Sequence, residues 1–493
     1  MKQTTFRCGT DVPCPNDNIS VPFGLIGTVE HYLQRTGVLD LLDTFKERGV
    51  PLRRIAVAMC THILMGNNSM AKCSDWLSDP FVLKELGFGK NVSQRTINRA
   101  MNIIGDHADE VLVQLWEGMN GLLHLTDTDV NMDGSAVVFN GPNSELGDFG
   151  YPRDFKDQSR PQVAFMTAEL SHSKIPFFIR AYSGRVPDVT QYRDSLPPIF
   201  DMIRQGSWIV MDNGGASGDI LDSIVGAGNK YLTRVKMNRS DVNRMTEHKD
   251  GWQYVEDGVC CLTHTFGHSG RTTYLFYSVD NWLRSYRAAE RRFGKMVDTV
   301  NKFREGKVCK SDYVTIRNNI FATVDVSISV QDRLYDFTDT EKDELIRGSM
   351  PAFSGFFKLE SSEQLTPCEA LDKYRARATV EHLIHSLKRV SGIKPLRVWK
   401  ESSIRGSMLL ALLSETTMAI ARYRMEPRKH IKDSGGRRIE QDSRPSTESV
   451  VWSLSHLTIC RVIENKVRKK AVFSNWDGIS REVFARIRAD AYG

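Results

Sequence analysis

The spacing of apolar residues changes once in the first half of the chain, and this change limits the possible folds more than any other feature. Between Pro51 and Gly121, apolar residues such as Ile55, Ala58 and Met59 recur three and four positions apart, which predicts helices. After Gly121 the apolar residues alternate, or form short runs bounded by turn residues, which predicts strands. The first fifty residues are harder to place. We therefore expect a helical N-terminal region followed by an α/β region.

The order of the predicted strands indicates the type of sheet. Three strands with tight connections precede a helix and a fourth strand, an order typical of an antiparallel meander leading into an α/β fold. A further helix and strand follow. The runs are 130–139, 162–170, 175–182, helix 190–204, 207–211, helix 216–226 and 231–236.

In the second half of the chain, the succession of predicted strands and helices is interrupted and then resumes. Residues 240–350 read as an insertion, with strand-like pieces at 262–266, 271–279 and 320–326 around a long charged helix, 280–305. A strand at 355–360, a helix at 366–389, an apolar helix at 404–422 and a linker at 426–448 follow. The predicted domains are 1–124 (helical, DNA-binding), 125–239 and 351–425 (two parts of one catalytic core), 240–350 (β-rich insertion) and 426–493 (basic linker and C-terminal piece).

Composition narrows the class of protein. The chain has 493 residues, 41% hydrophobic and 26% charged, as in a soluble globular protein, and its length favours several domains. No run approaches the roughly 18 apolar residues of a membrane span, and the first ten residues lack a secretory signal. We therefore expect a cytoplasmic protein with no membrane partner, associated with the nucleoid if it binds DNA. Its nine scattered cysteines show no zinc-site spacing and fit reduced thiols.

Charge is distributed unevenly. The net charge of the chain is +6, yet residues 373–400 hold eight Lys or Arg against one acid, a net of +7. Residues 422–444 hold eight cations against four acids, and residues 461–470 hold five against one. The C-terminal third is thus the electropositive part, and such blocks suit a polyanion.

A segment near residue 95 has the pattern of a DNA-reading helix. Ser93 is a candidate N-cap, and the residues that follow, including Arg95 and Arg99, combine basic and amide side chains with an apolar stripe. A helix-turn-helix recognition helix has this pattern, as does an ordinary helix with a solvated face. Arg95 and Arg99 are our candidate DNA contacts from this region.

Two aspartates occupy strands. Asp133 lies within the first predicted strand, and Asp212 ends the apolar strand 208–211, just before a Gly-Gly turn. Carboxylates at strand ends are how α/β sheets present ligands at their edge. Each aspartate alone could equally cap a turn.

The helix after Lys373 adds a third acid. At roughly 100° per residue, Tyr374, Arg377, Glu381 and Lys388 share one face, separate from the apolar arc. Arg377 and Glu381 could form an ordinary i,i+4 ion pair. Alternatively, Glu381 binds a cation while its basic neighbours hold an anionic polymer, as two-metal phosphoryl transfer requires.

At this point the chain resembles a known family. Tyr374, Arg377, Glu381 and Lys388 have the spacing of the Tyr-Arg-Glu-Lys signature of insertion-sequence DDE transposases. The resemblance covers roughly residues 125–425 and includes the segment 184–188 and the strand at 355–357. It implies an RNase H-like core, a mixed sheet flanked by helices, with a β-rich insertion and an α-helical N-terminal DNA-binding region.

The resemblance also implies roles. Asp133, Asp212 and Glu381 would be the catalytic and metal-binding triad for two Mg²⁺ ions, with Mn²⁺ expected to substitute. Tyr374, Arg377 and Lys388 would contact the backbone of the transposon end. Members of the group cut DNA at terminal inverted repeats and join the 3′ hydroxyl ends to target DNA, which suggests a homodimer acting on two ends.

One position departs from the family. Where relatives carry Arg, this chain has His385, which bears on contacts with the DNA end and not on the three acids. Two rival hypotheses stay open: a transposase-derived DNA-binding protein without catalysis, and an RNase H-like nuclease without strand transfer. All three acids are present, which favours an enzyme.

Overall fold

The chain folds into two compact units in a computed structural model. The first unit comprises residues 1–231 and 373–493, and the second comprises residues 232–372. The structure describes residues 20–141, 144–150, 160–247, 251–266, 270–307, 338–389, 393–394, 396–427, 429–434, 437–442, 444–464 and 467–492. The strand expected at 320–326 lies outside the described residues.

The N-terminal part of the first unit is helical, as the apolar spacing predicts for residues 51–121, and two further helices lie among the described residues of the first fifty, which the spacing did not place. After a short strand, β1 (Ser20–Val21), come α1 (Phe23–Arg35), α2 (Val38–Thr44), α3 (Leu52–Leu64), α4 (Met70–Trp76), α5 (Pro80–Glu85), α6 (Gln94–Asp106) and α7 (Ala108–Leu123). Ser93 caps α6 by accepting a hydrogen bond from the backbone N–H of Thr96.

The mixed sheet of the first unit follows in the expected order. Its strands are β2 (Val130–Val138), β3 (Gln162–Leu170), β4 (Pro176–Ser183) and β5 (Trp208–Met211). β3 pairs with β2 and β4 antiparallel, whereas β5 pairs with β2 in parallel. The parallel pair needs a crossover, which α8 (Asp188–Met202) supplies. α9 (Gly218–Gly226) follows β5.

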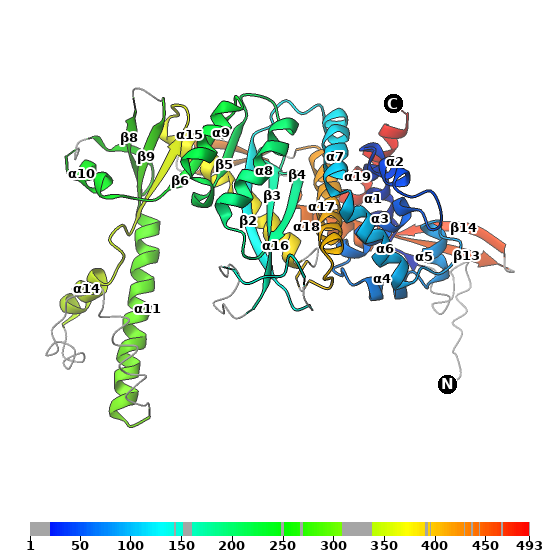
Figure 1. Cartoon of the computed structure of the whole chain (residues 1–493), viewed down its shortest axis with the longest axis horizontal. Helices are drawn as coiled ribbons and strands as arrows, with labels where there is room; N and C mark the ends of the chain where they lie inside the picture. Colours follow the sequence, from blue (N-terminus) through cyan, green and yellow to red (C-terminus); the bar gives the residue numbers. More distant parts are fainter. Residues whose placement is uncertain are drawn as a thin grey trace. The chain divides into compact units, whose positions relative to one another are not determined.

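Helices cover both faces of this sheet. On one face the hydroxyl of Tyr192, from α8, lies 3.4 Å from the carbonyl oxygen of Met132 in β2. On the same face the hydroxyls of Tyr182 in β4 and Ser195 in α8 form a hydrogen bond. The other face meets α16 (Ala378–Arg389) and α17 (Glu401–Tyr423). Figure 1 shows α8 in front of β2–β4, α16 behind them and α17 next to β4. Residues 131, 133 and 135 of β2 point to the second face, because side chains alternate along a strand.

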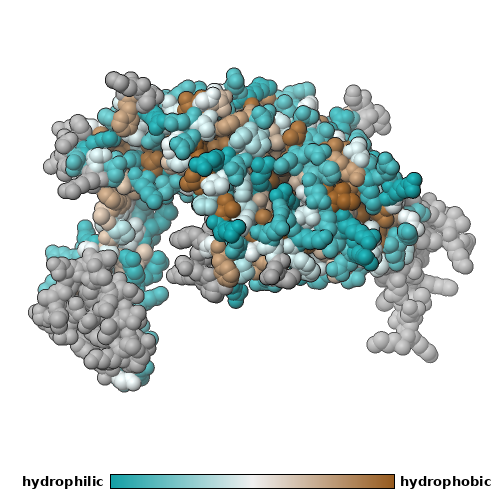
Figure 2. Space-filling view, in the orientation of Figure 1, coloured by the Kyte–Doolittle hydropathy of each residue, from teal (hydrophilic) through white to brown (hydrophobic). Residues whose placement is uncertain are grey.

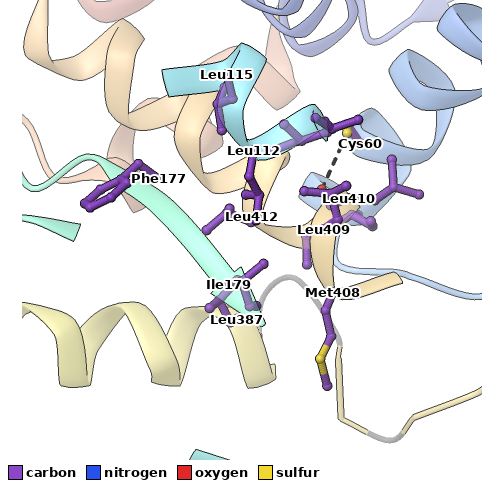
Figure 3. Close-up of a cluster of buried hydrophobic side chains, with 14 of the residues drawn as sticks. Cys60, Leu112, Leu115, Phe177, Ile179, Leu387, Met408, Leu409, Leu410 and Leu412 are labelled. Carbon is purple, nitrogen blue, oxygen red and sulfur yellow. Dashed lines mark hydrogen bonds between the residues drawn. The ribbon is translucent and has the colours of Figure 1, made fainter. Parts of the chain in front are cut away.

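α17 lies at the centre of the first unit. It runs along α6, α1, α3 and β4, and nearly all of its residues are buried. Figure 3 shows Leu410 and Leu412 of α17 among Leu112 of α7 and Phe177 of β4, with the Cys60 thiol of α3 donating to the Leu410 carbonyl. α17 is the one helix, among described residues, long and apolar enough for a membrane span, but 94% of its apolar window is buried in the protein.

The second unit contains an antiparallel sheet and, among its described residues, the helices α10, α11 and α14. Its strands have the order β6-β10-β9-β8-β7. The first two residues of β6, Lys230 and Tyr231, are assigned to the first unit. The elements are β6 (Lys230–Val235), α10 (Arg239–Glu247), β7 (Gln253–Glu256), β8 (Val259–Thr265), β9 (Thr272–Ser278), α11 (Val279–Arg304), α14 (Asp339–Gly348) and β10 (Phe356–Ser361). The long charged helix expected at 280–305 is α11.

The segment interpreted as a linker contains regular structure. β11 (Lys429–Ser434) pairs with β12 (Arg437–Asp442), and α18 (Thr447–His456) follows. β13 (Thr458–Glu464), β14 (Val467–Ser474) and α19 (Gly478–Tyr492) complete the chain. β13 pairs with β1, so the C-terminal piece joins the N-terminal helices. The domain boundaries inferred from the sequence remain predictions.

Candidate active site

The helix expected at 366–389 is two helices, and the break falls on Arg377. α15 (Pro367–Ala376) ends and α16 begins on either side of this residue. The N–H of Arg377 donates to the carbonyl of Tyr374, three residues earlier, so the turn is tighter than α-helical. A single helical wheel therefore does not describe residues 374–388. Their side chains nevertheless meet, because the break turns Arg377 toward the sheet.

Asp133 and Asp212 occupy corresponding positions on neighbouring parallel strands. β2 and β5 pair with Asn131 opposite Val210, so two residues further along each chain Asp133 and Asp212 come side by side. The carboxylate of Asp133 accepts the N–H of Gly134, and that of Asp212 accepts the N–H of Asn213, each at 2.8 Å. Both acids are thus held by local backbone donors and by the register of the sheet.

Arg377 joins the three acids. Its Nη1 atom donates to Oδ2 of Asp133 at 2.9 Å, and its Nη2 atom donates to Oε1 of Glu381 at 2.6 Å and lies 4.0 Å from Oδ2 of Asp212. The arginine side chain is 8% exposed, and its Nε atom has no hydrogen-bond partner among the described residues. Three carboxylates from β2, from the end of β5 and from the first turn of α16 therefore converge on one cation.

The electrostatics of the cluster are dominated by burial and by this shared guanidinium. Burial raises the pKa of the Asp133 carboxyl above its ordinary value, while Arg377 and the N–H of Gly134 oppose the rise. Burial works to lower the pKa of Arg377, but the surrounding acids outweigh it and raise the pKa above its ordinary value, so the guanidinium stays charged. Three acids with one guanidinium leave a net charge of about −2 when all are ionised, and such a site attracts cations.

The remaining signature residues also face the sheet. The hydroxyl of Tyr374 donates to Oδ1 of Asp212 at 3.3 Å, and the ring of Tyr374 lies against Arg377. Lys388 is buried and donates through Nζ to the hydroxyl of Ser135 at 2.6 Å. Arg377 and Lys388, expected to contact DNA, are therefore directed into the protein here. His385 is exposed.

Arg95 and Arg99 lie elsewhere. Both are exposed on α6, and no contact between them and the three acids is found in the part of the chain that the structure describes. Two amide side chains of that helix face α17: Asn98 and Asn102 accept hydrogen bonds from Ser403.

Sequence reasoning missed a polar network under α16. Asn131 donates to the carbonyl of Ala376 and to the hydroxyl of Thr379, each at 3.1 Å, and Thr379 donates to Glu169. Burial raises the pKa of Glu169 to about 7. The available signal was the alternation of polar residues at 131, 133 and 135 in an otherwise apolar strand.

A second missed contact anchors α15. Asp129 accepts the N–H of Trp208 and the ammonium of Lys373, each at 2.8 Å. The Lys373 ammonium also lies 5.3 Å from the centre of the Trp208 ring. Asp129 therefore ties the residues before Tyr374 to the start of β5.

The donor set of the cluster suits a hard divalent cation. Among the described residues, no three His, Cys, Asp or Glu side chains gather into a metal cluster by themselves. In this structure the guanidinium of Arg377 occupies the position between the three carboxylates where a metal cation would bind. Carboxylate oxygens are the ligands that Mg²⁺ prefers, so Asp133, Asp212 and Glu381 fit such an ion by chemistry.

Comparison with known proteins gives one family. The family described as "Transposase DDE domain" matches residues 156–414, a little more than half of the chain. The matched span includes Asp212 and Glu381 but begins after Asp133. A search of curated proteins finds no match. One solved structure, the cryo-EM structure of the piggyBac transposase synaptic complex with hairpin DNA, aligns at 9% identity and a TM-score of 0.40, over 97% of this chain and 86% of that chain. On the extent of the family match, the chain belongs to the DDE transposase domain family.

Proposed function

We propose that this protein is an active transposase that cuts DNA at the terminal inverted repeats of a transposon and joins the 3′ hydroxyl ends to target DNA. The observation that carries the proposal is the convergence of Asp133, Asp212 and Glu381, from three separate elements, on one cationic position. Phosphoryl transfer requires mainly positioning and charge neutralisation, and with divalent ions bound such a cluster would supply both. An RNase H-like core formed by β2–β5 and the helices on its two faces would carry it.

The three carboxylates would hold two Mg²⁺ ions, or Mn²⁺ in their place. When bound, these ions supply Lewis acidity to the attacking and leaving oxygens. Asp133 and Asp212 are held by the sheet register and by the N–H groups of Gly134 and Asn213, so they are oriented before any ion arrives. Glu381 is the most exposed of the three, with 57% of its side chain accessible, and so has the most freedom to adjust.

The basic signature residues would act on DNA. Arg377 and Tyr374 contact the acids here, and a divalent ion at the acids would free both side chains for the phosphates of the transposon end. Lys388 would do the same after leaving Ser135. Arg95 and Arg99, exposed on α6, would contact the DNA from the N-terminal region. A homodimer would serve the two ends, and a nucleoid-associated cytoplasmic location would suit the substrate.

The test uses purified full-length protein, a duplex ending in the inverted repeat that flanks the gene, and Mg²⁺. Cleavage followed by joining of the 3′ end to a target duplex supports the proposal. Cleavage without joining indicates an RNase H-like nuclease, and binding without cleavage indicates a DNA-binding derivative. Either of the last two outcomes overturns it. The absence of inverted repeats on either side of the gene would also contradict the proposed substrate, the terminal inverted repeats.

A further inference from the structure

The helix α11 of the second unit has two different sides. One side packs on α14: the hydroxyl of Tyr286 donates to Oδ1 of Asp343 at 2.6 Å, and the Arg347 guanidinium lies 5.4 Å from the Trp282 ring centre. Ala289, on the same side, is fully buried. These contacts attach this side of α11 to α14.

The opposite side is a row of exposed cations. At about 100° per residue, five basic residues fall within an arc of roughly 80°, turned away from Trp282, Tyr286 and Ala289. All five are exposed. We name this the α11 cationic face, formed by Arg284, Arg287, Arg291, Lys295 and Lys302. Figure 2 shows hydrophilic residues along the part of α11 that grey atoms do not cover.

The charge of this face is largely uncompensated. Between Arg284 and Lys302 the only acid on the arc is Asp298, which leaves five cations against one acid. Within the described ranges, Arg284, Arg287, Arg291 and Lys302 have no ion-pair partner. Like charges three and four residues apart destabilise a helix. Repulsion among these cations therefore destabilises α11 when nothing is bound, and a bound polyanion would relieve the repulsion.

We propose that the α11 cationic face binds the phosphate backbone of double-stranded DNA, an inference that rests on the proposed function for its substrate. From Arg284 to Lys302 the helix extends about 27 Å. Duplex DNA carries about one charge per 1.7 Å of axis, so a straight row of cations meets phosphates along its whole length. A protein partner is disfavoured, because protein interfaces have an apolar or aromatic centre and no large apolar side chain lies on this arc.

The experiment measures binding of full-length protein to a random-sequence duplex over a series of salt concentrations. The triple variant Arg284→Ala, Arg287→Ala, Arg291→Ala should bind at least about tenfold more weakly at low salt. Its salt slope should fall by about 0.9 for each phosphate that the variant no longer neutralises. The corresponding triple Lys variant, which keeps the charges, should retain most of the slope.

The helix supplies matched controls. Arg292 is next to Arg291 but points about 100° away, and its Nη2 donates to the carbonyl of Ser349 at 3.3 Å. Lys307 lies just beyond the helix with Nζ 2.8 Å from Oε2 of Glu305. Arg291→Ala should therefore lower the slope more than Arg292→Ala, and Lys302→Ala more than Lys307→Ala. Circular dichroism checks that helical content is unchanged.

The outcomes separate this inference from the proposed function. If the wild-type protein does not bind duplex DNA, the proposed function fails and this inference fails with it. If the wild-type protein binds and cleaves DNA while the triple Ala variant keeps its affinity and salt slope, only the inference is overturned. A triple Ala variant that binds DNA normally but no longer binds polyglutamate also overturns it and assigns the face to an acidic protein.

Discussion

Arg377 Nη1 lies 2.9 Å from Oδ2 of Asp133, and this ion pair connects the start of α16 to the middle of β2 across 244 residues of sequence. The same guanidinium donates to Glu381 through Nη2. The protein thus carries its own counter-ion at the position where the proposed metal ions would bind. A metal ion and Arg377 therefore compete for the same carboxylates.

This competition makes a prediction for Arg377→Ala. Without metal, the variant should lose on the order of 3 kcal/mol of unfolding free energy, because a buried acid loses its partner. Mg²⁺ should raise its thermal midpoint more than that of the wild type. Thermal unfolding with and without Mg²⁺ measures both effects. Arg375→Ala, at an exposed position, should change stability by no more than about 0.5 kcal/mol. Equal Mg²⁺ shifts in wild type and Arg377→Ala would refute the competition.

The three acids can be tested singly. Asp133→Ala, Asp212→Ala and Glu381→Ala should each lower cleavage by at least about a hundredfold, because each removes a ligand of the ions that stabilise the transition state. DNA binding should stay nearly intact in a filter-binding assay. Asp127, which accepts the N–H of Asp129 in the turn before β2, provides the control Asp127→Ala. An acid whose loss leaves near-wild-type cleavage does not belong to the triad.

Lys388 should contribute to DNA binding even though it is buried here. Lys388→Ala should lower the salt slope of binding to transposon-end DNA by about one unit, because one phosphate is no longer neutralised. Ser135→Ala removes the hydrogen bond to Lys388 and keeps its charge, so this variant should preserve the slope. Arg375→Ala should have a smaller effect than Lys388→Ala. Equal losses at both basic positions would indicate a diffuse basic patch.

The packing of α6 on α17 depends on two glycines. A Cβ atom on Gly105 would lie 1.8 Å from the carbonyl oxygen of Ser402, and one on Gly406 would lie 2.2 Å from that of Met101. Because backbone atoms cannot easily move aside, Gly105→Ala and Gly406→Ala should each cost about 1–3 kcal/mol or more. Gly121→Ala, in α7 with nothing within 4 Å, should stabilise by roughly 0.5–1 kcal/mol. Denaturant unfolding compares them, and a neutral Gly105→Ala would contradict the close packing.

Glu169 predicts a pH dependence. Its pKa is raised to about 7 from 4.5, so the folded state favours the protonated acid. Its contribution to stability is fully present below about pH 4.5 and is lost as the pH rises through about 7. Relative to Glu169→Gln, the wild type should therefore lose on the order of 3 kcal/mol between about pH 4 and 8. Parallel stability curves for the two proteins over that range would show that Glu169 does not titrate.

The regular elements of the first unit were largely predictable. Alternation and short apolar runs over 130–139 and 162–170 predict β2 and β3, and both strands are buried along nearly their whole length because helices cover the two faces of the sheet. The break at Arg377 was not predictable from local sequence. Its neighbours Ala376 and Ala378 are strong helix formers, and the tight turn accompanies ion pairs with acids from distant strands.

The candidate site was likewise predictable only in part. Residue types and spacing single out Asp133, Asp212 and Glu381, but they do not show that Arg377 lies between them. The hairpin β11–β12 and the pairing of β13 with β1 were also missed. Residues 426–448 are rich in Arg, Lys, Ser and Gly, a composition typical of linkers, and the pairing of β13 depends on a partner strand more than 400 residues away.

The position of α17 has a consequence for how the chain is made. Residues 23–64 need α17 as a packing partner, yet α17 is completed only when Tyr423 has been synthesised. Domains generally fold in N-terminal order during translation, but here the first helices must wait for some 360 residues of later chain. During that interval the surfaces of α1 and α3 that pack on α17 stay uncovered on the ribosome. Biosynthesis of this protein should therefore depend on chaperones that bind nascent chains, and a truncation before residue 401 should aggregate.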